Sequence, residues 1–158
     1  MDTGETTHEK LTRNLNELLQ ELRVAQAGVQ ILFGFLLSIT FTDFYHEGTG
    51  PLERTTHLVA VFFAVGAVVC LTAPAAWHRV LFRQGKRAEI MRMATRSTIA
   101  GLACLAGAVT ASLALLAEVV IGPWAGLVAG AVCLVASGLL WFALPLARRD
   151  DGGSDDED

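Results

Sequence analysis

The ionisable side chains that could take part in proton or cation chemistry gather at one boundary of the apolar segments. They are Asp43, His46, Glu47, Glu53, His57 and Glu118. His57 is the most interesting of them, because it lies one turn into an apolar run, where an imidazole could bind a cation or titrate near neutral pH. The commoner interpretation of the set is a solvated loop, and that of His57 an ordinary interfacial residue. A proton-coupled transporter usually carries such a group deeper in the membrane, and the apolar cores of this chain hold none.

Two glutamines add a second polar feature. Gln26 and Gln30 are four residues apart and share one face of a predicted helix. Amides in hydrocarbon need a hydrogen-bond partner, so we expect an interhelical bond or a side chain that reaches the interface, with contact to a polar ligand as the alternative. Together with Asp43, His57 and Glu118 they form the candidate polar site of the membrane rim.

The sequence offers no catalytic motif. Its serines lack a nearby His–acid arrangement, and no GxSxG, HExxH or phosphate-binding loop occurs. Cys70, Cys104 and Cys133 lie inside apolar runs without the spacing of a metal site or a disulfide framework, so we interpret them as packing residues. We expect a protein that is not an enzyme, with no catalytic residue, no metal and no cofactor. No basic and aromatic platform for nucleic acid is present either.

The elements that must position these residues are four apolar segments. The chain has 158 residues, 53% of them hydrophobic and 18% charged, against about 25% charged in an ordinary soluble domain. No Asp, Glu, Lys or Arg occurs in 24–42, 55–77, 97–117 or 119–147. Runs of roughly 20 apolar residues are long enough to cross a bilayer as helices. We therefore predict an all-α protein whose transmembrane domain, 25–147, is a four-helix bundle with spans at about 25–44, 55–77, 97–117 and 124–146.

A basic connector, 78–96, joins the second span to the third. Its six cationic residues are candidate contacts for lipid or a partner: Arg79, Arg83, Lys86, Arg87, Arg92 and Arg96. Such a connector is expected on the cytoplasmic side, which places both termini there as well. Anionic headgroups would then be the natural partners of the connector.

The N-terminal segment, 1–24, has the pattern of an amphipathic helix that continues into the first span. Leu11, Leu15, Leu18 and Leu22 lie on one stripe, and Leu15, Leu18 and Leu22 are candidate contacts for lipid or a partner. The stripe has three possible partners: the lipid surface, the connector, or another chain, such as a second copy or a membrane-protein partner. We favour the connector, or an equivalent basic surface on a partner, because Glu17 and Glu21 would pair with arginines there. The lipid surface is the second choice. The acidic tail, 148–158, is predicted to be disordered.

A resemblance to a known family rests on two segments of the sequence. They are NELLQELRVAQAGVQILFGFLLS at 16–38 and APAAWHRVLFRQGKR at 73–87. The chain resembles an uncharacterised family of small four-span inner-membrane proteins, common in high-GC Gram-positive bacteria, from Asn14 to about Val120. The resemblance implies a multi-pass protein of a bacterial inner membrane. Some members are labelled sodium/proton antiporters, but the family brings no established activity.

These observations favour a non-enzymatic membrane protein that interacts with or regulates a partner through its cytoplasmic helix and basic connector. The alternative is a small ion-coupled transporter or permease, resembling a cation/proton antiporter. The absence of charged residues from the four cores favours the first hypothesis. A water-filled cavity lined by Gln26, Gln30, Thr72 or His57 would favour the second.

Overall fold

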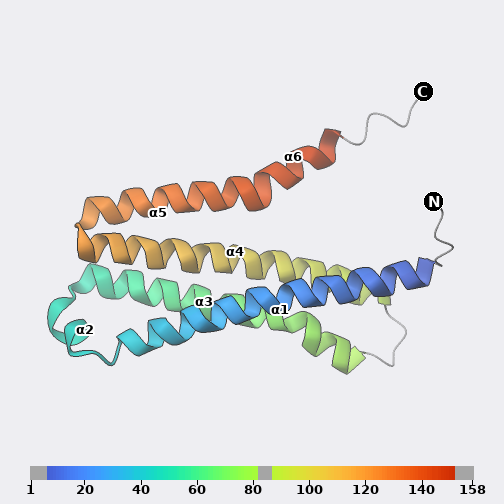
Figure 1. The fold of residues 1–158 in the computed structure, drawn as a ribbon, viewed down its shortest axis with the longest axis horizontal. Coiled ribbons are helices and arrows are strands. Elements are labelled where there is room, and N and C mark those ends of the chain that lie inside the picture. Colours follow the sequence, from blue (N-terminus) through green and yellow to red (C-terminus); the bar gives the residue numbers. More distant parts are fainter. Residues whose placement is uncertain (1–6, 82–86, 152–158) are drawn as a thin grey trace.

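The computed structural model describes residues 7–81 and 87–151, and all regular elements within these ranges are helical. In chain order they are α1 (Thr7–Ile39), α2 (Asp43–Gly48), α3 (Pro51–Leu81), α4 (Arg87–Val120), α5 (Pro123–Gly138), a π-helical turn (Leu139–Ala143) and α6 (Leu144–Asp151) (Figure 1). Four apolar stretches are long enough to cross a membrane: Leu22–Ile39, Pro51–Trp77, Arg92–Val120 and Pro123–Ala147. The all-α fold with four helices of membrane-spanning length is therefore confirmed.

The first helix joins the amphipathic segment to the first apolar segment without a break, as the sequence predicts. It is 33 residues long and ends at Ile39, five residues before the predicted end of the span. The side chain of Thr40 donates to the carbonyl of Leu37, and that of Thr42 to the carbonyl of Ile39. Thr42 also caps the short helix α2, because its hydroxyl oxygen accepts a hydrogen bond from the Tyr45 amide.

The second and third long helices extend further than their predicted spans. The helix α3 continues past Trp77 to Leu81, and α4 begins at Arg87. Much of the predicted connector, 78–96, is thus helical and continuous with the two spans. The helices extend into the described parts of the basic stretch, 78–81 and 87–96, since Arg is itself a good helix former.

The last long helical segment contains a short π-helical turn before a proline. The tight turn into α5 uses Gly122 at a φ of 135°, a conformation that favours glycine, followed by Pro123 in the first turn. Further on, the Leu144 amide bonds to the Leu139 carbonyl, five residues back. The next residue is Pro145, which has no amide hydrogen to continue the α-helical pattern. The rod bends there, between α5 and α6 (Figure 1).

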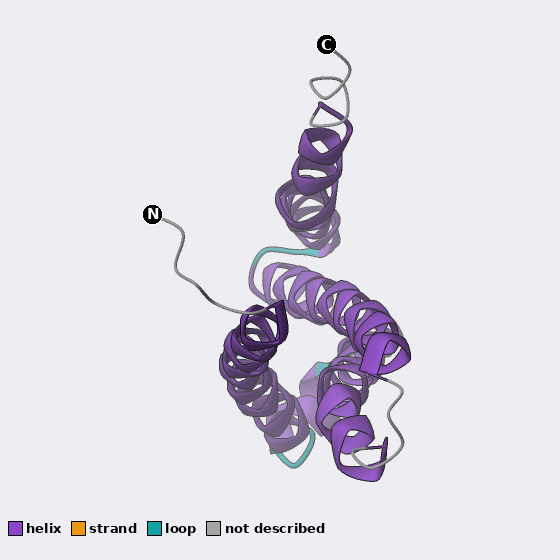
Figure 2. Cartoon of the chain, turned by 90° about the vertical axis from the view of Figure 1, so that its right-hand side faces the viewer, coloured by secondary structure: helices purple, strands orange, loops and turns teal. Residues whose placement is uncertain are grey.

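Glycines allow α3, α4 and α5 to approach closely. A Cβ atom on Gly107 would lie 2.7 Å from the Phe63 ring, and one on Gly101 would lie 2.7 Å from the Leu71 side chain. On the far side of α4, a Cβ on Gly126 would lie 2.9 Å from the Ala114 carbonyl oxygen. The main contacts of α5 with the other long helices are to α4, so α5 lies on the outer side of α4 (Figures 1 and 2).

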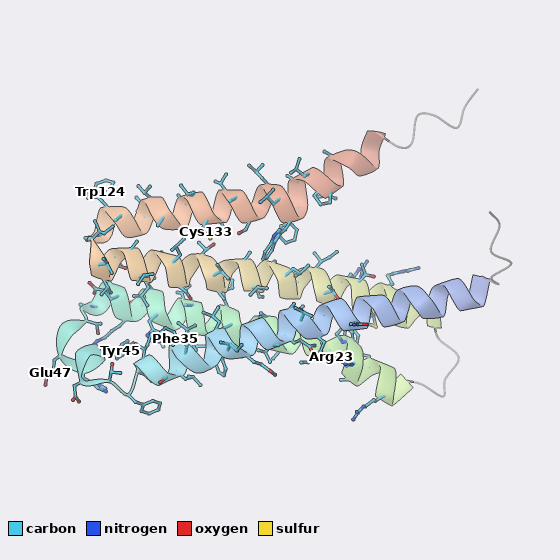
Figure 3. The ribbon with its side chains drawn as sticks, in the orientation of Figure 1. Arg23, Phe35, Tyr45, Glu47, Trp124 and Cys133 are labelled. Carbon is cyan, nitrogen blue, oxygen red and sulfur yellow. The ribbon has the colours of Figure 1, made fainter. Side chains whose placement is uncertain are left out.

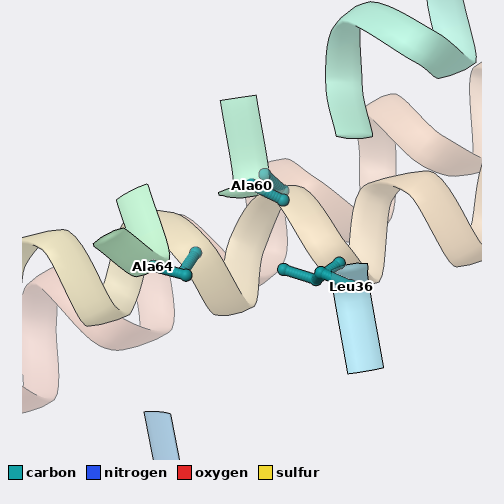
Figure 4. Packing of buried hydrophobic residues seen from close by; sticks show 5 residues of the cluster. Leu36, Ala60 and Ala64 are labelled. Atoms are coloured by element: carbon teal, nitrogen blue, oxygen red, sulfur yellow. The ribbon is translucent and has the colours of Figure 1, made fainter. Parts of the chain in front are cut away.

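The helix α1 packs against α3 through two small apolar clusters. In the first, Leu36 meets Ala60 and Ala64 of α3, together with two alanines of α4 (Figure 4). In the second, Leu22 and Val29 meet residues of α3 that include Leu71. The small alanine side chains bring the helix backbones together, which is how helices associate where lipid removes any hydrophobic preference for protein.

Replacing Gly126 by Ala should destabilise the protein by about 1–3 kcal/mol, because the new methyl group would collide with the Ala114 carbonyl and the Glu118 side chain. The matched control is Gly28→Ala, where no atom lies within 4 Å of the new Cβ and the better helix propensity of Ala should be neutral or stabilising. Unfolding in mixed micelles would measure both. Equal stabilities for the two variants would contradict the close contact of α4 and α5.

Candidate functional site

The charged side chains separate to the two ends of the molecule. Arg79, Arg92 and Arg96 are exposed and lie at the end where α3 finishes and α4 begins. Arg23 is exposed at the same end, whereas Glu47 lies at the opposite end (Figure 3). We call Arg23, Arg79, Arg92 and Arg96 the basic rim. Of these, Arg79, Arg92 and Arg96 are the described part of the cationic connector that the sequence predicts.

Several predicted contact residues fall outside what the structure describes. Arg83 and Lys86 lie between the described ranges, and the side chains of Arg87, Leu15 and Leu18 are also outside the described part. Leu22 is described, and it is buried in the cluster that α1 forms with α3. Its partner is therefore α3, and it contributes to the packing between these two helices.

Pro74 creates a polar junction inside α3. Proline has no amide hydrogen, so the carbonyl four residues earlier, that of Cys70, loses its helical donor. The hydroxyl of Ser97, on α4, donates to this carbonyl at 2.6 Å. In the same turn, the side-chain amide of Gln26, on α1, donates to the Leu71 carbonyl at 2.6 Å. We call Gln26, Ser97 and these two carbonyls the proline junction; it joins three helices at one level.

Gln26 and Gln30 therefore have different environments, although they are one helical turn apart. Gln26 is partly buried and its amide belongs to the proline junction. Gln30 is exposed on the surface of α1. Thr72 is exposed too, and its hydroxyl donates to the Val68 carbonyl of its own helix. These side chains do not converge on a common space.

At the acidic end, α2 covers His57. The imidazole is fully buried, and both of its nitrogens lack a hydrogen-bond partner within the described residues. The Tyr45 ring, from α2, contacts it edge-on with ring centroids 5.0 Å apart. The Arg54 guanidinium holds α2 in place, since it donates to the His46 carbonyl at 3.0 Å and to the Thr49 hydroxyl at 3.3 Å. His57 is thus enclosed between its own helix, α3, and α2, which Arg54 holds in place.

Glu118 is a second buried ionisable group near this end. It is 8% exposed, and its Oε1 has no partner in the described part of the chain. The Phe63–Gly107 contact fixes the antiparallel register of α3 and α4. Counting six residues along each helix places His57 opposite Leu113, five residues or about 7 Å along the axis from Glu118. Asp43 is exposed on α2, so the three predicted rim residues occupy three different environments.

These groups limit the chemistry that the acidic end can perform. Among the described residues, no group of three or more His, Cys, Asp or Glu side chains is arranged to hold a metal ion. A buried imidazole and a buried carboxyl oxygen without partners can form further hydrogen bonds. Leaving such groups unsatisfied costs about 1–3 kcal/mol each, so both are places where a water molecule or a polar ligand would be stabilising.

Three contributors were not recognised as partners from sequence. Tyr45 has the pattern of an interfacial aromatic, Ser97 that of a residue at the start of a span, and Arg54 that of an isolated charge in a loop. The one available signal was Pro74, whose freed carbonyl must be satisfied in an apolar environment. It shows that a donor is needed, but not which helix supplies it.

Comparison with known proteins gives one match. The model of a family of unknown function, DUF6328, matches residues 4–145, in agreement with the resemblance to an uncharacterised family. No curated protein and no solved structure matches the chain.

The proline junction predicts a coupling between Ser97 and Pro74. Ser97→Ala should cost about 0.6–1.7 kcal/mol of stability, the range for hydrogen bonds between membrane helices. In a Pro74→Ala background the same change should cost much less, because an alanine at position 74 restores an amide donor to the Cys70 carbonyl. Unfolding of the four proteins in mixed micelles gives this double-mutant cycle. Strict additivity would show that the Ser97 hydroxyl does not replace the missing amide.

Proposed function

We propose that this chain, which belongs to the family of unknown function DUF6328, is a non-enzymatic membrane protein of the bacterial inner membrane. Its role is to interact with or regulate a partner at the cytoplasmic face, through the N-terminal half of α1 and the basic connector. Both termini are cytoplasmic in this proposal. The observation that carries it is the helical N-terminal segment, which extends beyond α3 at the end that bears the basic rim.

The extension follows from the register of α1 and α3. Gln26 lies opposite Leu71, and counting ten residues outward along each helix brings Asn16 level with Leu81, where α3 ends. The backbone of α1 is helical from Thr7, so roughly two turns lie beyond the end of α3. At 100° per residue, Leu11, Leu15 and Leu18 continue the line of the buried Leu22 within about 40°. The apolar stripe of α1 thus continues beyond the end of α3, which is the helix that packs against Leu22.

An apolar stripe beyond α3 needs another partner. Full burial of each leucine is worth about 1.5–3 kcal/mol relative to exposure in water. The basic rim at the same end supports anionic headgroups as one neighbour, since each cation near such a surface contributes about 1 kcal/mol before screening. A docked helix would then combine an apolar stripe with a cationic surface that holds it near the membrane.

Hydrogen exchange of the full-length protein in nanodiscs tests this docking. We expect slow exchange of the amides in 9–24, and at least tenfold faster exchange when Leu11, Leu15 and Leu18 are changed together to Ser. Leu22 stays unchanged, because it packs against α3. The matched control changes three polar positions off the stripe, Asn14, Asn16 and Gln20, to Ser, and it should leave the protection in place.

Two lipid compositions separate the possible partners. Protection that appears only when the nanodisc contains anionic lipid assigns the stripe to the membrane surface, and equal protection in neutral lipid assigns it to the chain itself. Fast exchange of 9–24 in the unmodified protein, in both lipids, would refute the docked helix and with it this function.

A second candidate function is a small ion-coupled permease, and the observation that favours it is the buried His57 and Glu118 at the acidic end. It predicts cation-dependent proton flux in proteoliposomes that falls at least tenfold in His57→Gln and Glu118→Gln. The control is Asp43→Asn, an exposed carboxylate, which should retain the flux. Absence of flux above empty vesicles would remove this candidate.

A further inference from the structure

The exposed surface of α1 carries a polar amide within its apolar stretch. Large apolar side chains are exposed there, as on α5, and they include Val24, Ile31 and Phe35. The exposed positions of α1 on the side away from α3 also include Ala27, Gln30, Gly34 and Ser38. At 100° per residue these four fall within about 80° of one another, on the side away from Leu22, Val29 and Leu36. We call them the α1 outer face.

Gln30 is the residue of this face that requires a partner. It is the ninth of the 18 residues in the apolar stretch Leu22–Ile39, next to Val29, which packs against the middle of α3. Its side chain is exposed, and it forms no hydrogen bond with the described residues. Reaching the level of Arg23 would require about 10 Å along the helix. A glutamine side chain is too short for this, so the amide remains in the apolar layer.

We propose that two copies of this protein associate through their α1 outer faces, with the two Gln30 amides hydrogen-bonded to each other across a two-fold axis normal to the membrane. The amide carries both an acceptor oxygen and donor hydrogens, so two copies satisfy each other. A two-fold interface brings each residue of a central line close to its own counterpart. The occupant of the face is therefore a second copy of the chain, in parallel orientation.

The residues around Gln30 fit this arrangement. A Cβ atom on Gly34 would have no neighbouring atom within 4 Å, as is also the case at Gly28, so packing among the described residues does not require a glycine there. Gly34 and Ser38 are four residues apart and present small surfaces that allow two helices to approach. The leucine stripe of 9–24 lies on the opposite side of α1, so this association leaves the proposed docking of that stripe intact. The two proposals can therefore fail independently.

The test is single-molecule photobleaching of the full-length protein in lipid vesicles over a range of dilutions. We expect a dimer, with a dissociation constant that rises roughly three- to tenfold in Gln30→Leu, the range for a membrane hydrogen bond. Gln30→Asn should retain part of the affinity. Gly34→Leu should weaken the dimer at least tenfold, because its larger side chain separates the helices while finding open space in the single chain.

The matched control is Gln26→Leu, which removes the same amide from the same helix but from a bond inside the chain. It should leave the dissociation constant of the dimer unchanged, although it lowers the stability of the fold. A purely monomeric wild type, or a dimer that tolerates both Gln30→Leu and Gly34→Leu, would overturn the proposal. So would a Gln26→Leu variant that weakens the dimer as much as Gln30→Leu does.

Discussion

The carbonyl groups beside Pro74 constrain the arrangement of three helices. A membrane interior offers no water to backbone groups, so a carbonyl that loses its helical donor must find another one within the protein. Ser97 of α4 supplies this donor to the Cys70 carbonyl, and Gln26 of α1 donates an additional hydrogen bond to the neighbouring Leu71 carbonyl. Because each bond is short and comes from a different helix, the axial positions of α1 and α4 relative to α3 are fixed at this level.

Close packing extends outward from the proline junction. Leu71 packs over Gly101, one turn from Ser97, and Phe63 packs over Gly107, which is six residues further along α4. Lipid chains are as apolar as leucine, so helices in a membrane gain little from contact unless their backbones come near. Glycine permits that approach, and a hydrogen-bonded junction sets which glycine meets which side chain. In the α4–α5 contact, Gly126 likewise allows the two backbones to approach closely. No comparable polar junction accompanies it among the described residues.

The sequence predicts the long helices well, because their signals are local. Segregated charge identifies the four spans, and the leucine periodicity predicts that α1 continues through Leu22. The contacts between residues of different helices could not be predicted in the same way. They depend on the register between the helices, which no local sequence pattern encodes. The cap α2 is also absent from the prediction: Gly48, Gly50 and Pro51 indicate a loop, while the Thr42 cap that starts this six-residue helix is a weak signal.

Gln26 and Gln30 show how precisely the helix register must be known before the environment of a side chain can be predicted. Residues four apart on an α-helix are displaced by about 40° around the axis, and the predicted common face of Gln26 and Gln30 is correct to within that angle. The edge of the α1–α3 contact falls between them, so one amide is bonded inside and the other is exposed. Two hydroxyl groups avoid this problem, because Thr72 and Ser112 bond to carbonyls of their own helices. The hydroxyl of Ser97 instead bonds to α3, and those of Thr98 and Thr110 have no partner among the described residues.

Amide and imidazole groups are held further from the helix backbone than the hydroxyls of Ser and Thr. They therefore reach the carbonyls of their own helix less readily. Gln26 has found a partner in α3. His57, covered by α2, has found only the edge of an aromatic ring among the described residues, and Gln30 faces outward. The amide and the imidazole that lack a hydrogen-bond partner among the described residues lie at two separate places. Gln30 lies in the middle of α1, and His57 lies at the acidic end, where the Oε1 of Glu118 also has no partner in the described part of the chain.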